Sequence, residues 1–156
     1  MNKVDEQKIS QHIIDLVESY CANNKWDYQT KSSCDLAIPK GLNWKYYIDW
    51  QFKEDKLKVT VTYSIYWNLT QPMCKSLNEL LNEKNMQYLL NGIEYQLDTD
   101  YGLSLMFENY FNYDEMPDID NQDLINFDAI KKKINMVKKE LNKNVLCDRM
   151  KLKMNI

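Results

Sequence analysis

Hydrophobic and polar side chains alternate with a period of two through the middle of the chain. From Leu57 to Trp67 the odd-numbered residues are hydrophobic or aromatic, and the residues between them are Lys, Thr, Ser and, near the end, Tyr66. Residues 46–52 alternate in the same way, with Tyr47 among the polar positions. Successive side chains of a strand point to opposite faces of a sheet, so the pattern predicts two antiparallel strands with one buried and one solvent-exposed face.

Three other segments have hydrophobic residues at spacings of three and four, which is typical of amphipathic helices. They cover residues 5–22, 70–91 and 123–141. Thr70 is placed as the N-cap of the second helix, and Gly92 is the residue type favoured after a helix end. The third helix is either a core helix or part of a homodimer seam, and its two heptads leave both interpretations open.

Shorter alternating stretches complete the predicted sheet. Residues 26–28 and 34–38 predict strand pieces around a turn at 31–33, and residues 93–97 and 103–111 predict a second hairpin. The predicted order is helix, three strands, helix, two strands, helix. Because strands and helices come in blocks, we expect an α+β fold, an antiparallel sheet of about five strands with helices packed on it. We expect one domain over residues 1–142 and a C-terminal tail over residues 143–156.

Composition and charge narrow the class of partner. The chain has 156 residues, of which 44% are hydrophobic and 28% charged, and its net charge is -3. This is the composition of a globular domain. A mildly acidic protein repels phosphate backbones, so we expect no nucleic-acid partner. Lysines do concentrate at 131–133 and 138–139, where we predict the solvated face of the third helix.

Cysteine spacing and hydropathy indicate the compartment. Cys21, Cys34, Cys74 and Cys147 are scattered, with no C-x-x-C pair. The first residues lack the apolar core of a signal peptide, and no apolar run approaches membrane length. We therefore expect reduced thiols, a cytoplasmic protein and no membrane insertion.

No residue pattern predicts catalysis or a bound cofactor. His12 is the only histidine, no motif places a nucleophile or carboxylate with it, and the cysteines lack the spacing of zinc ligands. Asp114, Asp118, Asp120 and Asp123 invite a calcium interpretation, but the loop from Asp118 has neither the glycine nor the closing glutamate of an EF-hand. We expect a protein that is not an enzyme and that has no metal and no cofactor.

Exposed aromatic side chains are the remaining candidates for a functional surface. Tyr47 and Tyr66 fall on the predicted solvent-exposed face, and Trp44 lies at the entrance of its strand. Exposed rings are enriched at protein interfaces, so we predict Trp44, Tyr47 and Tyr66 as partner-binding residues. The alternative is that they are isolated surface aromatics.

Short motifs over most of the chain resemble YbjN-type bacterial domains. The likeness runs from about Ile9 to Leu141. It depends on the shared order of Asn24-Lys25-Trp26, Asp35-Leu36-Ala37-Ile38, Trp44 with Tyr46 and Trp50, Leu80-Leu81, Asn85, Gly92, and Gly102-Leu103 through Met106-Phe107.

The resemblance implies a fold similar to type III secretion chaperones, a twisted antiparallel sheet with helices packed on it. Such chaperones are small, acidic and commonly dimeric, and YbjN-type proteins are described as candidate sensory-transduction regulators without defined catalytic residues. We therefore expect a protein-binding regulator or chaperone-like adaptor of the bacterial cytosol, and a homodimer is compatible with it. The alternative is a small-molecule sensor with a pocket between helix and sheet, lined by Tyr and Trp.

Overall fold

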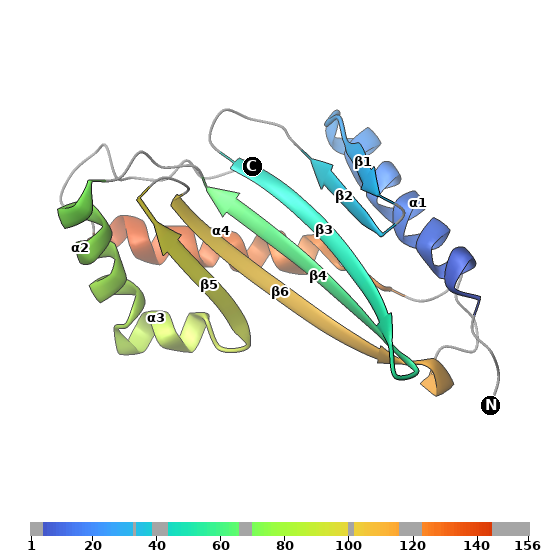
Figure 1. The fold of residues 1–156 in the computed structure, drawn as a ribbon. Helices are drawn as coiled ribbons and strands as arrows, with labels where there is room; N and C mark the ends of the chain where they lie inside the picture. The colour runs from blue at the N-terminus through green and yellow to red at the C-terminus, as the bar shows by residue number, and fades with distance from the viewer. Residues whose placement is uncertain are drawn as a thin grey trace.

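The computed structural model of the protein describes residues 5–32, 34–38, 44–65, 70–99, 102–115 and 123–144. Within these residues an antiparallel sheet of six strands has the order β1-β2-β3-β4-β6-β5 (Figure 1). The strands are β1 (Gln29–Ser32), β2 (Asp35–Ile38), β3 (Trp44–Lys53), β4 (Lys56–Ile65), β5 (Ile93–Asp98) and β6 (Gly102–Asn112). The helices are α1 (Glu6–Asn24), α2 (Gln71–Leu81), α3 (Lys84–Leu89) and α4 (Phe127–Asn144), and a single 3-10 turn, Tyr113–Glu115, follows β6.

Two helices cover the same face of the sheet. The indole N–H of Trp50, on β3, donates to the Ser10 hydroxyl of α1 at 2.9 Å. The amine of Lys138, on α4, donates to the Tyr63 hydroxyl of β4 at 2.7 Å. Trp50 lies opposite Val59, and Val59 and Tyr63 are four residues apart on β4, so both contacts are made on one face. In Figure 1, α4 accordingly passes behind the strands.

The hydrophobic core fills the space between this face and the helices. The stripes predicted for the first and third helices are confirmed, and so is the alternation of β3 and β4. The buried side chains include Ile9, Ile13 and Val17 of α1, Tyr46, Ile48 and Trp50 of β3, Val59, Val61 and Tyr63 of β4, and Ile134, Val137 and Leu141 of α4. None of the described helices is long and apolar enough to cross a membrane.

The predicted class, α+β with an antiparallel sheet, is confirmed, but the prediction of about five strands is wrong. Gln29–Ser32 and Asp35–Ile38 form two strands, β1 and β2, that pair with each other, and their register shifts between Thr30 and Ser32. Trp26 and Tyr28, predicted as part of a strand, precede β1.

The second predicted helix is two helices. The chain leaves the helical conformation at Glu83, whose backbone is extended, and α3 then begins at Lys84. Hydrophobic residues continue at near-helical spacing through this break, at Leu77, Leu81 and Met86, and all three are buried. Because the hydrophobic pattern does not change there, it did not reveal the break.

Side chains cap the starts of the three longer helices. Asp5 accepts hydrogen bonds from two backbone N–H groups of α1 at 3.1 and 3.2 Å. The Thr70 hydroxyl accepts from the backbone N–H of Met73 at 3.3 Å, which confirms the predicted N-cap of α2. The Asn126 carboxamide oxygen accepts from a backbone N–H of α4 at 3.1 Å, so this helix begins later than the predicted residue 123.

Candidate functional site

The face of the sheet opposite α1 and α4, which we call the open face, has no described helix packed on it. Its side chains alternate with the core positions along each strand, and most of them are half-buried. None belongs to the hydrophobic core cluster. The open face is formed by Asp35, Lys45, Tyr47, Asp49, Lys58, Thr60, Thr62, Ser64, Ser104, Met106, Glu108 and Tyr110.

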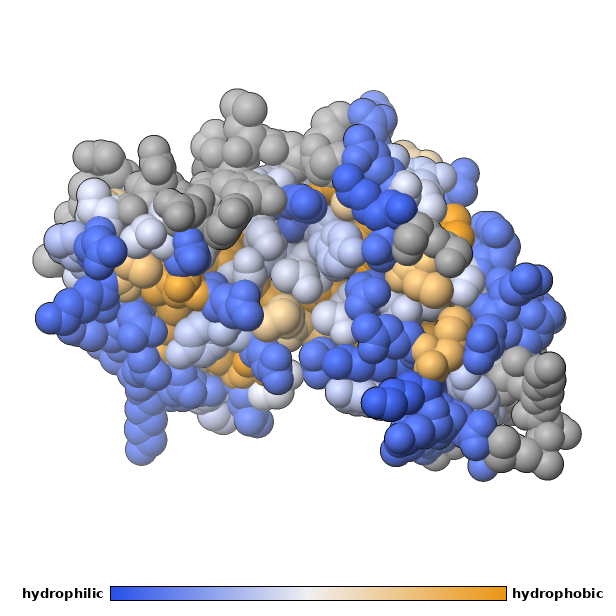
Figure 2. Space-filling view, in the orientation of Figure 1, coloured by the Kyte–Doolittle hydropathy of each residue, from blue (hydrophilic) through white to orange (hydrophobic). Residues whose placement is uncertain are grey.

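Short hydroxyl side chains occupy the middle of the open face. Thr60, Thr62 and Ser64 lie along β4, the strand between β3 and β6, and the hydroxyls of Ser64 and Ser104 hydrogen-bond across the strands at 2.9 Å. Figure 2 shows the molecule from this side, with a surface of intermediate hydropathy over the middle of the sheet and both hydrophilic and hydrophobic residues toward its ends. A partner loses less hydration energy on such a surface than on a charged one.

Tyr47 lies on the open face beside a pair of aspartates. Its hydroxyl donates to Asp35 Oδ2 at 2.7 Å, and this hydrogen bond, together with burial, raises the pKa of Tyr47 to about 12. Asp35 lies directly opposite Asp49 in the ladder between β2 and β3. Burial, followed by repulsion from Asp35, raises the pKa of Asp49. Like charges in opposed positions destabilise a sheet, so this pair is held at a cost to stability.

The aspartate pair is only partly compensated within the described residues. The charge of Lys58 lowers the pKa of Asp49, but Lys58 forms its ion pair with Glu108, at 3.3 Å, rather than with either aspartate. Asp35 Oδ1 is also buried without a hydrogen-bond partner. The two carboxylates therefore leave a negative charge on this part of the open face.

In another part of the open face, opposite charges pair with each other. Lys58 lies 5.8 Å from the ring centroid of Tyr110, in addition to its ion pair with Glu108. The Tyr110 hydroxyl donates to the second oxygen of Glu108 at 3.3 Å. The side chain of Tyr110 is 61% exposed, which makes it one of the most exposed large hydrophobic residues in the described chain.

The structure separates the three aromatic residues that were predicted to bind a partner. Tyr47 lies on the open face, as predicted. Trp44 is half-buried at the edge of the covered face, with its ring centroid 5.0 Å from that of Trp26 and 5.6 Å from that of Tyr46. Tyr66 lies outside the described residues. The structure therefore does not bring Tyr47 and Trp44 together on one surface.

Lys138 corrects the prediction of a fully solvated lysine face on the third helix. It is 2% exposed and its Nζ lies 4.9 Å from the centroid of the Tyr63 ring. The reason is its position, four residues after Ile134 and three before Leu141, which places it within the hydrophobic stripe. Burial lowers the pKa of Lys138 to about 8 and raises the pKa of Tyr63.

The hollow between helix and sheet is small. It has a volume of about 180 Å³ and lies between α4, β4 and β6, where Val59, Val61, Phe107 and Ile130 line it. Its described lining contains Phe but neither Tyr nor Trp, in contrast to the pocket expected for a small-molecule sensor. Pockets for drug-sized ligands usually have at least about 300 Å³.

No group of three or more potential metal ligands occurs among the described residues. Of the four aspartates considered for calcium, Asp114 and Asp123 are described and exposed, whereas Asp118 and Asp120 lie outside the described residues, as does Cys147. Cys21, Cys34 and Cys74 form no disulfide. Burial, followed by the charge of Asp27, raises the pKa of Cys21 to about 11, so this thiol is a poor nucleophile.

Comparisons with known proteins add little to this geometry. No family model and no curated protein matches the chain. Among solved structures, the chain is similar to YbjN from E. coli, a proposed transcription regulator, with 8% sequence identity and a TM-score of 0.32. The similarity covers 82% of this chain and 84% of that one. A TM-score of 0.32 does not show that the two proteins share a function.

Proposed function

We propose that the protein is a non-enzymatic adaptor or regulator that binds a partner protein through the open face. The observation that carries this proposal is the one-sided coverage of the sheet. Both α1 and α4 pack on one face. On the other face most side chains are half-buried and outside the core cluster, although Tyr110 is exposed and Ala37, opposite Tyr47, is buried. Antiparallel sheets can leave one face exposed to solvent without any function. The area of the open face and the types of its residues support the proposal as well.

The open face is large enough for an ordinary protein interface. At a rise of about 3.3 Å per residue and about 4.8 Å between strands, each strand residue covers about 16 Å² of sheet. The six strands then present on the order of 700 Å², close to the roughly 800 Å² that each partner buries in a standard complex.

The residues of the open face are of the types that protein interfaces use. Tyr47, Met106 and Tyr110 belong to the aromatic and Met side chains enriched there, and the centre between them is hydroxyl-rich. The pair Asp35 and Asp49, whose charge Lys58 only partly offsets, adds a preference for a basic side chain of the partner. A partner that places an Arg or Lys side chain at this pair removes a repulsion that the free protein retains.

The small-molecule alternative has less support. The hollow between helix and sheet has a volume of about 180 Å³, below the roughly 300 Å³ at which pockets for drug-sized ligands begin. The open face, by contrast, is broad and has no enclosing walls among the described residues. This geometry favours a macromolecular partner.

Site-specific photo-cross-linking in the native host tests the proposal. A benzophenone amino acid replaces Thr62, in the middle of the open face, and in a matched variant it replaces Lys75, an exposed residue of α2. We expect Thr62 to yield a covalent adduct of defined mass that Lys75 does not yield. Mass spectrometry then identifies the partner, and an adduct of twice the chain mass identifies a second copy.

A competition experiment relates the adduct to the chemistry of the face. Excess unlabelled protein should suppress the adduct from Thr62, whereas excess Asp49→Lys protein should not, because the added charge repels a basic partner side chain. Circular dichroism checks that the variant remains folded. A second variant carries the benzophenone amino acid at Met106, opposite Thr62 on the open face. The proposal is contradicted if Thr62 and Lys75 give equal adducts, or if neither Thr62 nor Met106 gives an adduct.

A further inference from the structure

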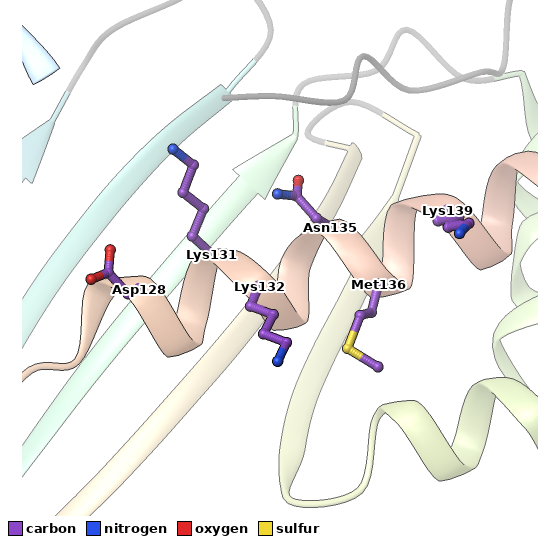
Figure 3. Close-up of a pocket in the computed structure, with 6 residues that line it drawn as sticks. All are labelled: Asp128, Lys131, Lys132, Asn135, Met136 and Lys139. Atoms are coloured by element: carbon purple, nitrogen blue, oxygen red, sulfur yellow. The ribbon is translucent and has the colours of Figure 1, made fainter.

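The outer side of α4 carries a groove that plays no part in the open face. Figure 3 shows six residues around it, all from α4: Asp128, Lys131, Lys132, Asn135, Met136 and Lys139. The groove has a volume of about 420 Å³ and opens to solvent. It lies across the helix from Ile134 and Val137, which are buried in the core.

The charge of the groove is opposite to that of the whole chain. α4 contains six lysines and two acidic residues, whereas the chain has a net charge of -3. Two of the helix's lysines are accounted for elsewhere, since Lys138 is buried at Tyr63 and Lys143 pairs with Glu140 at 3.7 Å. The lysines of the groove form no ion pair with any described residue, although Asp128 lies at the start of the same helix.

The lining of the groove is mostly apolar. Met136 is 42% exposed, one of three large hydrophobic residues in the described chain with so much exposed surface. In Figure 3 its side chain points to the same side of α4 as that of Lys132. The methylene stems of the lysines extend this apolar surface while their ammonium groups remain in water.

We propose that this groove binds an acidic segment of a partner protein that also presents an apolar side chain. The apolar side chain packs against Met136, and carboxylates on either side of it along the helix pair with Lys132 and Lys139. Methionine adapts to apolar side chains of different shapes, so the groove accepts a class of sequence rather than one sequence.

The chemistry favours an acidic peptide over a nucleic acid. A nucleic acid would match the lysines equally well, but single-stranded binders also need aromatic rings on which bases stack, and the groove lining has none. Asp128 at one end repels a continuous phosphate backbone. Met136 provides neither a charge nor a hydrogen-bond donor for a nucleic acid, whereas a Leu, Ile or Phe side chain can pack against it.

Fluorescence anisotropy and NMR test the proposal directly. The probe is a fluorescein-labelled peptide of about twelve residues, with leucines on one helical face and glutamates on the other. We expect saturable binding that weakens as salt rises. Binding should shift the amide resonances of residues 128–139 of ¹⁵N-labelled protein and leave those of β3 and β4 unchanged, which distinguishes this groove from the open face.

Three matched probes separate the contributions to binding. A peptide with glutamine in place of leucine, and one with glutamine in place of glutamate, should each bind at least about tenfold more weakly. A single-stranded DNA of similar charge should also bind more weakly than the acidic peptide. If the DNA or the leucine-free peptide binds as tightly, the groove is only a positively charged surface and the proposal fails.

Variants of the protein provide the last control. Lys132→Glu with Lys139→Glu should weaken binding of the acidic peptide by about tenfold or more, as should Met136→Glu. Lys8→Glu with Lys75→Glu changes the net charge equally at exposed sites on α1 and α2 and should have little effect. Equal losses in the two double variants, or no saturable binding up to about 1 mM peptide, overturn the proposal.

Discussion

At the scale of single residues, Lys138 is the clearest case of a side chain whose environment opposes its charge. It is almost fully buried and donates to the Tyr63 hydroxyl, and burial lowers its pKa to about 8. In the unfolded chain the amine has its ordinary pKa of about 10.4. Between these two values the unfolded state binds more protons, so the contribution of Lys138 to stability becomes more favourable as the pH rises from about 8 to about 10.

Replacing Lys138 with Met removes this pH dependence. At pH 7 the variant avoids the burial of a charged amine, but it leaves the Tyr63 hydroxyl without this donor. The free energy of unfolding of the variant relative to the wild type should therefore fall by up to about 3 kcal/mol between pH 7 and pH 10. Urea denaturation at several pH values measures it. A constant difference across this range would show that Lys138 titrates normally in the folded protein.

Asp49 is a second residue whose charged form is destabilised by its surroundings in the folded protein. Its pKa is raised by burial and then by Asp35, so the folded state binds the proton more strongly than the unfolded state does. Stability therefore falls as the pH rises through the pKa of Asp49. We expect Asp49→Asn to stabilise the protein at pH 7 by up to about 1 kcal/mol, and to lose this advantage below about pH 3.

The control for Asp49 is Asp123→Asn, which removes the same charge from an exposed position. It should change stability by less than about 0.5 kcal/mol at either pH. Destabilisation by Asp49→Asn at pH 7 would show that the carboxylate has a favourable partner, and the inferred attraction for a basic side chain would then fail as well.

At the scale of elements, capping side chains determine where the helices begin. Asn126 accepts a backbone hydrogen bond at the start of α4. Asn126→Ala should lower the free energy of unfolding by about 1 kcal/mol, because a backbone N–H of the first turn loses its acceptor. Asn78→Ala, at an exposed site inside α2, should change stability little or raise it, since Ala favours a helix interior. Chemical denaturation of both variants measures the difference.

The open face and the groove of α4 are also properties of elements, because each is formed by residues at regular spacing on strands or on one helix. The alternation of β3 and β4 could be predicted and is confirmed. The break between α2 and α3 could not, since hydrophobic residues continue through it at Leu81 and Met86. A helix break depends on the backbone conformation at Glu83, which one polar residue in the sequence does not specify.

At the scale of the whole molecule, the order of strands predicts where the fold is most stable. β4 lies between β3 and β6 and pairs with both along its full length. β1 is a four-residue edge strand with an irregular register. Native-state hydrogen exchange should therefore show the slowest amides in β4 and much faster exchange in β1. Exchange of β1 amides at the rate of β4 would indicate that the sheet unfolds as one unit.

Sequence alone determined the local part of this structure, namely which residues alternate along strands, which form helical stripes and which caps begin a helix. These features follow from spacings of two to four residues, over which side-chain direction is set by the backbone geometry. Tyr47 could be placed on a polar face for this reason. Its partner Asp35 could not be found, because the hydrogen bond joins residues twelve positions apart on two strands.

Only the tertiary structure decided which surfaces remain available. Both α1 and α4 pack on the same side of the sheet, and this choice leaves the open face without a described helix and buries Lys138 against Tyr63. Each helix has one hydrophobic stripe, and this stripe can pack on any apolar surface. The sequence of the helix therefore does not specify which face of the sheet the helix covers. That is settled by the connections between elements and by the joint packing of distant segments, which no short window of sequence contains.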